Sequence, residues 1–109
     1  MLGNVLSKIS KVSISPKSYN NKFGVPLSLF NLKQNDEFGI LEVGMDKKGE
    51  IDYLSKIIEP DVGVITNINY AHAKNFKNIK QIALAKSEII NNIKTYGYVV
   101  LNADDGHFR

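Results

Sequence analysis

At 109 residues, 43% of them hydrophobic, the chain can form one small domain with an apolar core, and its lack of cysteine excludes disulfide scaffolds and cysteine-based metal or redox sites. No run approaches the roughly 20 apolar residues of a membrane span, and the first residues do not read as a signal peptide, so we expect a cytoplasmic protein with no membrane partner. The net charge of +3 comes from scattered lysines and a single arginine, Arg109. It does not predict a nucleic-acid partner, because base and phosphate recognition favours arginine.

The first part of the chain alternates short helical and extended patterns. Leu2, Val5, Leu6 and Ile9 recur at helical spacing, and an extended segment follows them. Pro16 and a polar stretch after it interrupt regular structure. We therefore expect a helix over 2–9, a strand over 12–15, a break over 16–21 and a helix over 25–32.

The remainder shows a regular strand and helix alternation. Near-continuous apolar runs predict strands buried on both faces at 38–43, 62–66 and 98–101. Helices are expected between them over 51–58, stopped by Pro60, and over 78–95, ended by Gly97. The first two of these strands enclose a helix of crossover length and are expected to form a right-handed parallel βαβ unit. The fold class is therefore α/β, with a mostly parallel sheet flanked by helices, and such sheets bind ligands beyond the carboxyl ends of their strands.

Lys86 is the residue that fits this pattern least well. It shares one face of the expected long helix with six apolar residues: Ile79, Ile82, Ala83, Ile89, Ile90 and Ile93. A lysine is seldom fully buried unless it is paired. Either its stem lies along the sheet while the ammonium reaches water, or it is a functional amine that faces an anion or a metal–phosphate centre.

Polar residues follow each of the apolar strands at the same expected sheet edge. Glu42 ends the first strand, where it would pair with a helix N-terminus or bind a cation such as Mg²⁺. His72 follows the second strand, and Asn102 the third. Asp104 and Asp105 suit the first turn of a further helix. Together these groups predict an anion or metal–phosphate site, but their spacing does not determine a reaction.

Four ordered segments resemble the central domain of the Mur ligases, ATP-dependent enzymes that add amino acids to the peptidoglycan precursor. The segments are SYNNKFGVPLSL, ILEVGMDKKGEIDYL, PDVGVITNINYAHAKNFKNIKQIALAKSEI and VVLNADD. The N-N-x-x-G-V-P and E-x-G-x-x-x-x-G-E-I patterns favour the member that joins D-alanyl-D-alanine to the UDP-MurNAc-tripeptide. The resemblance implies that these two molecules are the substrates of the intact enzyme.

The resemblance also implies roles for individual residues. Glu42 would bind Mg²⁺ and His72 a second Mg²⁺, while Lys86 would be carbamylated on its ε-nitrogen and help to hold metal. In this family ATP activates a carboxylate as an acyl phosphate, which an amine then attacks, and the metal neutralises phosphate charge.

Nucleotide contacts are implied for three asparagines. Asn102 would lie near the adenine, and Asn20 or Asn21 near the phosphates of ATP. The sequence departs from the family in one respect, since it holds no G-x-x-G-K-[ST] phosphate-binding loop.

We therefore expect residues 1–109 to be a partial central, ATP-binding domain, without the phosphate-binding loop before it or the C-terminal domain after it. Such a fragment would be inactive alone and could have a complementing ligase fragment as its partner. The alternatives are a non-catalytic binding module that keeps the fold, and a fragment of a related ligase that extends folate polyglutamate chains.

Overall fold

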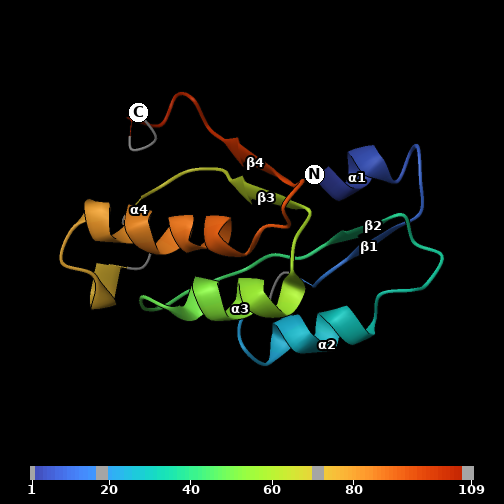
Figure 1. Ribbon diagram of the computed structural model, residues 1–109, viewed down its shortest axis with the longest axis horizontal. Coiled ribbons are helices and arrows are strands. Elements are labelled where there is room, and N and C mark those ends of the chain that lie inside the picture. The colour runs from blue at the N-terminus through green and yellow to red at the C-terminus, as the bar shows by residue number, and fades with distance from the viewer. Residues whose placement is uncertain (1, 17–19, 70–72, 107–109) are drawn as a thin grey trace. The chain divides into compact units, whose positions relative to one another are not determined.

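The computed structural model describes residues 2–16, 20–69 and 73–106, and it contains two compact units, Met1–Gly44 and Met45–Arg109. Each unit combines parallel strands with helices, as Figure 1 shows. Within the described ranges, no helix is both long enough and apolar enough to cross a membrane.

The first unit is built on one parallel strand pair. Its elements are α1 (Leu2–Leu6), β1 (Val12–Ile14), α2 (Gly24–Phe30) and β2 (Phe38–Ile40). β1 and β2 pair in the register Val12↔Phe38 to Ile14↔Ile40. The predicted order of helices and strands is confirmed, but β2 ends at Ile40 and not at residue 43.

Helical segments contact both faces of this strand pair. Gly3 of α1 lies against the side chains of Ile14 and Ile40, so a methyl group added there would collide with Ile14. Leu32, just after α2, lies against Gly39, which belongs to the alternate set of strand residues. Since successive strand residues point to opposite faces, α1 and the end of α2 cover opposite sides of β1 and β2.

The second unit has a second parallel pair with a longer crossover. Its elements are α3 (Glu50–Ile58), β3 (Val62–Ile65), η1 (Ala73–Asn75), α4 (Ile79–Ser87), η2 (Glu88–Asn92) and β4 (Tyr98–Leu101), where η denotes a 3₁₀ helix. β3 and β4 lie side by side in the register Val62↔Tyr98 to Ile65↔Leu101 (Figure 1). α3 packs against η2 and α4.

Each unit has one parallel strand ladder among its described residues, β1 with β2 in the first unit and β3 with β4 in the second. We expected the strands at 38–43 and 62–66 to form one βαβ unit around α3. These two strands belong to different units, so that expectation stays a prediction. Apolar runs identify strands, but they carry little information about which strand is the partner, because backbone hydrogen-bonding groups are the same in every strand.

The predicted helix over 78–95 is also corrected, because α-helix ends at Ser87 and continues as the shorter 3₁₀ helix η2. Asn78 begins α4, its side-chain oxygen accepting from the Gln81 amide at 3.0 Å. At the other end, Glu88 and Asn92 direct their side chains to α3. With three residues per turn Ile90 leaves the predicted face and is exposed, whereas Ile89 and Ile93 still face β3.

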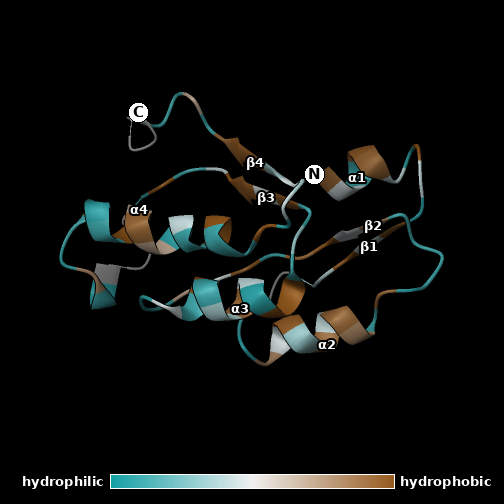
Figure 2. Cartoon of the chain, in the orientation of Figure 1, coloured by the Kyte–Doolittle hydropathy of each residue, from teal (hydrophilic) through white to brown (hydrophobic). Residues whose placement is uncertain are grey.

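β3 is buried on one face only and all four residues of β4 are exposed, which corrects the expectation that both strands are buried on both faces. Gly63 and Ile65 are buried, and Gly63 faces the side chains of Ile89 and Ile93. Val62 and Val64 point to the other face and are 50% and 44% exposed. In Figure 2 the ribbons of β3 and β4 are coloured largely as hydrophobic, although Val62, Val64 and all four residues of β4 are exposed.

The core of the second unit lies between α3, α4 and the inner face of β3. The buried apolar side chains of the second unit are Met45, Ile51, Leu54, Ile65, Ile68, Ile82 and Ala85. Ile51 and Leu54 on α3, and Ile82 and Ala85 on α4, recur at helical spacing, and β3 buries its alternate residues Gly63 and Ile65, so each element buries one side.

Candidate functional site

Lys86 lies in the last turn of α4, next to the buried Ala85 and four residues after the buried Ile82. Its side chain is half-buried, and its Nζ donates a hydrogen bond to the backbone oxygen of Asn67 at 3.0 Å. The acceptor lies in the loop after β3, at the carboxyl end of the strand pair. The amine therefore lies at the sheet edge and is held there by a backbone carbonyl.

The turn after β4 reaches the same loop. The Ile68 amide donates to Oδ2 of Asp105 at 2.8 Å. Asn102 shapes this turn, because its side-chain oxygen accepts from the Asp104 amide at 3.0 Å and its backbone oxygen accepts from the Asp105 amide at 3.1 Å. The side chain of Asn102 is exposed, so its amide end can contact a ligand while its oxygen supports the turn.

Glu42 belongs to the first unit and follows β2 by two residues. Its side chain is exposed, and its backbone amide donates to the Ser15 hydroxyl at 3.0 Å. Ser15 directly follows β1, so Glu42 lies at the carboxyl edge of β1 and β2, where ligands of parallel sheets bind. That Glu42 meets Lys86 in one site stays a prediction, and His72 lies outside the described residues.

The two asparagines expected near the phosphates have structural contacts of their own. The side-chain oxygen of Asn21 accepts from the amides of Phe23 and Gly24 at 3.0 and 2.9 Å and so orders the start of α2. Asn20 packs against Gly44, whose amide donates to the Asn20 backbone oxygen at 2.7 Å. Both asparagines stabilise the loop, and neither contact excludes a ligand at the rest of the side chain.

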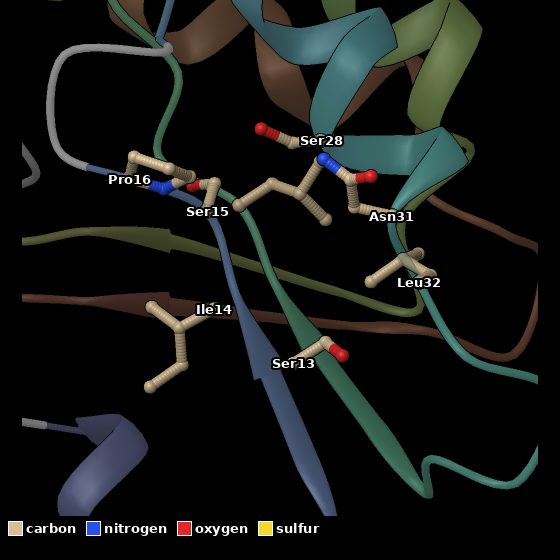
Figure 3. A pocket seen from close by; sticks show the side chains of 8 residues that line it. Ser13, Ile14, Ser15, Pro16, Ser28, Asn31 and Leu32 are labelled. Atoms are coloured by element: carbon tan, nitrogen blue, oxygen red, sulfur yellow. The ribbon is translucent and has the colours of Figure 1, made fainter.

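A small pocket in the first unit opens beside the ends of β1 and α2 (Figure 3). Its volume is about 210 Å³, and Ser28, whose hydroxyl is buried, contributes to its wall. Ligand sites of cofactor size usually occupy roughly 300–1,000 Å³. This pocket is therefore too small to hold a nucleotide and has room for water molecules that would bond the Ser28 hydroxyl.

The side chains present suit a magnesium ion held partly by substrate. In the part of the chain that the structure describes, no three His, Cys, Asp or Glu residues cluster as a preformed metal cage. Mg²⁺ commonly uses one or two carboxylates, several waters and the phosphates of its substrate. An exposed carboxylate at a sheet edge, as at Glu42, fits that requirement.

Two aspartates have perturbed acidities for structural reasons. The side-chain amide of Asn92, followed by Lys56, lowers the pKa of Asp52 below its usual value. The hydroxyl of Ser13, followed by the backbone amide of Lys33, likewise lowers the pKa of Asp36. Each donor stabilises the ionised carboxylate. Both aspartates support local structure away from the loops at the strand ends.

Two acidic side chains have contacts that the sequence did not predict: only a capping role was expected for Asp105, and none for Glu88. Glu88 accepts hydrogen bonds from the Gly49 amide at 2.9 and 3.2 Å and from the Asp52 amide at 3.1 Å, at the N-terminus of α3. The bond from Ile68 to Asp105 follows from the pairing of β3 with β4, because that register brings the following loops together. Knowing that β3 pairs with β4 would have indicated that Asp105 can reach the loop after β3.

Comparisons with known proteins agree on one family. The Mur ligase middle domain matches residues 1–109. The UDP-N-acetylmuramoyl-tripeptide–D-alanyl-D-alanine ligase of Buchnera aphidicola subsp. Acyrthosiphon pisum is 39% identical over 108 residues, which cover 99% of this chain and 24% of the relative. The chain thus spans about a quarter of the length of this relative.

Solved structures give the same result. The crystal structure of MurF from Acinetobacter baumannii superposes with a TM-score of 0.91 at 37% identity, over 96% of this chain and 23% of the other. The MurF ligase of Thermotoga maritima, in complex with ADP, superposes with a TM-score of 0.86 at 35% identity, over 95% and 24% of the two chains. The α/β fold predicted from the sequence is confirmed.

Proposed function

Because the chain belongs to the Mur ligase family, we propose that it forms the ATP-handling part of a ligase that joins D-alanyl-D-alanine to UDP-N-acetylmuramoyl-tripeptide. The observation that carries this proposal is the match over the whole chain to relatives with that activity. The ADP complex of the Thermotoga maritima relative supports a nucleotide ligand. The 109 residues contain no G-x-x-G-K-[ST] loop, so on their own they should not turn over ATP.

The proposed roles rest on the chemistry of each side chain. Glu42 offers an exposed carboxylate, the ligand type that Mg²⁺ prefers, and His72 would bind the second ion. Bound Mg²⁺ would neutralise the charge that spreads over the transferring phosphate oxygens. Asn102 would lie beside the adenine, and Asn20 or Asn21 beside the phosphates.

Lys86 would act as a carbamate. Its neutral amine would attack CO₂, which forms a nitrogen–carbon bond and releases one proton. The carbamate nitrogen keeps one hydrogen, and so it can still donate to the Asn67 carbonyl that Lys86 contacts at 3.0 Å. The cation would thereby become an anion with two oxygens without losing its backbone partner.

A chimera tests the function directly. These 109 residues would replace the matching quarter of the Acinetobacter baumannii ligase, and ADP release dependent on both substrates would be measured. We expect ligation, and we expect Lys86→Ala and Glu42→Ala to lower kcat by at least about 100-fold, the scale of lost transition-state stabilisation at a charged centre. Lys80→Ala, an exposed lysine on the same helix, is the matched control.

The outcomes separate the alternatives. A folded chimera that does not ligate would indicate a non-catalytic module. Equal activity of the Lys86→Ala and Lys80→Ala chimeras would refute the role proposed for Lys86. Carbamylation has its own readout, since ¹³C-bicarbonate should give a carbamate signal in NMR spectra that is absent from the Lys86→Ala protein.

A further inference from the structure

One peptide group connects Lys86 to Asp105. The carbonyl of the Asn67–Ile68 peptide accepts from the Lys86 Nζ at 3.0 Å, and the N–H of the same peptide donates to the Asp105 carboxylate at 2.8 Å. A cationic side chain from α4 and an anionic side chain from the turn after β4 thus bind the two ends of one peptide dipole.

The surroundings fix this peptide group in place. Ile68 is 6% exposed, and its buried side chain anchors the loop. Asp105 is held by its own turn, because its amide donates to the Asn102 backbone oxygen at 3.1 Å. The pairing of Ile65 with Leu101 starts both loops from adjacent strand ends. Lys86, the Asn67–Ile68 peptide and Asp105 thus form a bridge between α4 and the turn after β4, and the loops on both sides of this bridge are ordered.

The two hydrogen bonds reinforce each other. A carboxylate that accepts from the N–H pushes the electron density of the peptide group toward the peptide carbonyl oxygen, which makes that oxygen a better acceptor for a cation. Such cooperative strengthening is about 10–30% per bond, and bonds to charged groups are the stronger class. The Asp105 charge also opposes rotation of the peptide, which would turn the carbonyl away from Lys86.

We propose that Asp105 is a positioning residue that acts on Lys86 through the Asn67–Ile68 peptide. The importance of this positioning rests on the function proposed for Lys86, whereas the bridge itself is a property of the fold. If Asp105 served only to order its own turn, then removing its carboxylate would change the turn and leave the Lys86 amine where it is.

The test is NMR spectroscopy of the isotope-labelled 109-residue chain. Asp105→Ala removes the acceptor, and Asp105→Asn keeps an oxygen but loses the charge. Asp104→Ala is the matched control, since Asp104 is the neighbouring exposed aspartate. Two quantities are measured: the hydrogen-exchange rate of the Ile68 amide, and the nuclear Overhauser effect between the Lys86 ε-protons and residues 67 and 68.

In Asp105→Ala, Ile68 exchange should accelerate by about tenfold or more, as expected for loss of a charge-assisted bond, and the Lys86 contact should disappear. Asp105→Asn should show an intermediate effect, and Asp104→Ala should match the wild type. If the alanine variant does not fold, the asparagine variant carries the test. Faster Ile68 exchange with an unchanged Lys86 contact, or no change in either quantity, would overturn the proposal.

The NMR result for the Asp105 variants is independent of the activity measured with the chimeric ligase. An unchanged Lys86 contact in the Asp105 variants refutes the bridge but leaves the catalytic proposal intact. A chimera in which Lys86→Ala is fully active refutes the catalytic proposal but leaves the bridge measurable.

Discussion

Replacing Glu88 by alanine removes the carboxylate that holds the N-terminus of α3. Its oxygens accept from the Gly49 amide at 2.9 and 3.2 Å and from the Asp52 amide at 3.1 Å. Gly49 has a φ of 94°, a left-handed conformation that glycine adopts without strain. A negative charge at this position also faces the positive end of the helix dipole. The Glu88 side chain thus links η2, in the connection between β3 and β4, to the N-terminus of α3.

The loss of unfolding free energy expected for Glu88→Ala follows from the hydrogen bonds of the two amides. A hydrogen bond to a charged group contributes about 1.5–3 kcal/mol, but the Gly49 amide is exposed and water can replace its partner. The Asp52 amide is partly buried and loses more, and the interaction with the dipole adds about 0.3–1 kcal/mol. We expect Glu88→Ala to lower the free energy of unfolding by about 2 kcal/mol, and Glu88→Gln by about half of that.

Urea denaturation followed by circular dichroism measures this difference. Glu37→Ala is the control, because it removes an exposed glutamate whose carboxylate accepts no hydrogen bond from the residues that the structure describes. Hydrogen exchange of the Asp52 amide provides a local readout and should accelerate only in the Glu88 variants. Equal unfolding free energies for Glu88→Ala and Glu37→Ala would refute this account of the helix cap.

Ile82→Ala should lower the free energy of unfolding by about 2–5 kcal/mol, because Ile82 is 1% exposed. Leu84 lies on the same helix but is 60% exposed, so Leu84→Ala should lower it by less than about 0.5 kcal/mol. Similar denaturation midpoints for the two variants would contradict the packing of α4. Asn92→Ala should raise the pKa of Asp52 toward its usual value in an NMR titration, because the Asn92 amide is the main cause of the lowered pKa. A lowered carboxylate pKa contributes its full stabilisation above about pH 3.9, the unfolded-state value, and this contribution is lost as the pH falls through the folded-state pKa. The part of the unfolding free energy that Asn92→Ala removes through Asp52 should therefore vanish in acid. A loss of unfolding free energy that is independent of pH would exclude this contribution. The exposed apolar face of β3 and β4 should promote self-association at high concentration, which Val64→Lys should reduce in sedimentation experiments; a wild-type chain that stays monomeric throughout would rule this out.

Hydrophobic periodicity was sufficient to predict the type and order of the main elements. The apolar runs at β3 and β4 and the helical spacing on α3 are local patterns, and local patterns determine which side of an element can be buried. The family resemblance followed from ordered motifs for the same reason, since a motif is a property of the sequence. Lys86 was likewise identified by its contrast with the isoleucines around it.

The tertiary structure alone decided the strand pairing, the length of α4 and the partner of Lys86. α4 ends at Ser87 because Glu88 and Asn92 bond to α3, a contact across 36 to 40 positions that no local pattern encodes. The partner of Lys86 is the Asn67 carbonyl, and every residue in the chain has a carbonyl. Only the folded chain selects which of these identical backbone groups a side chain reaches.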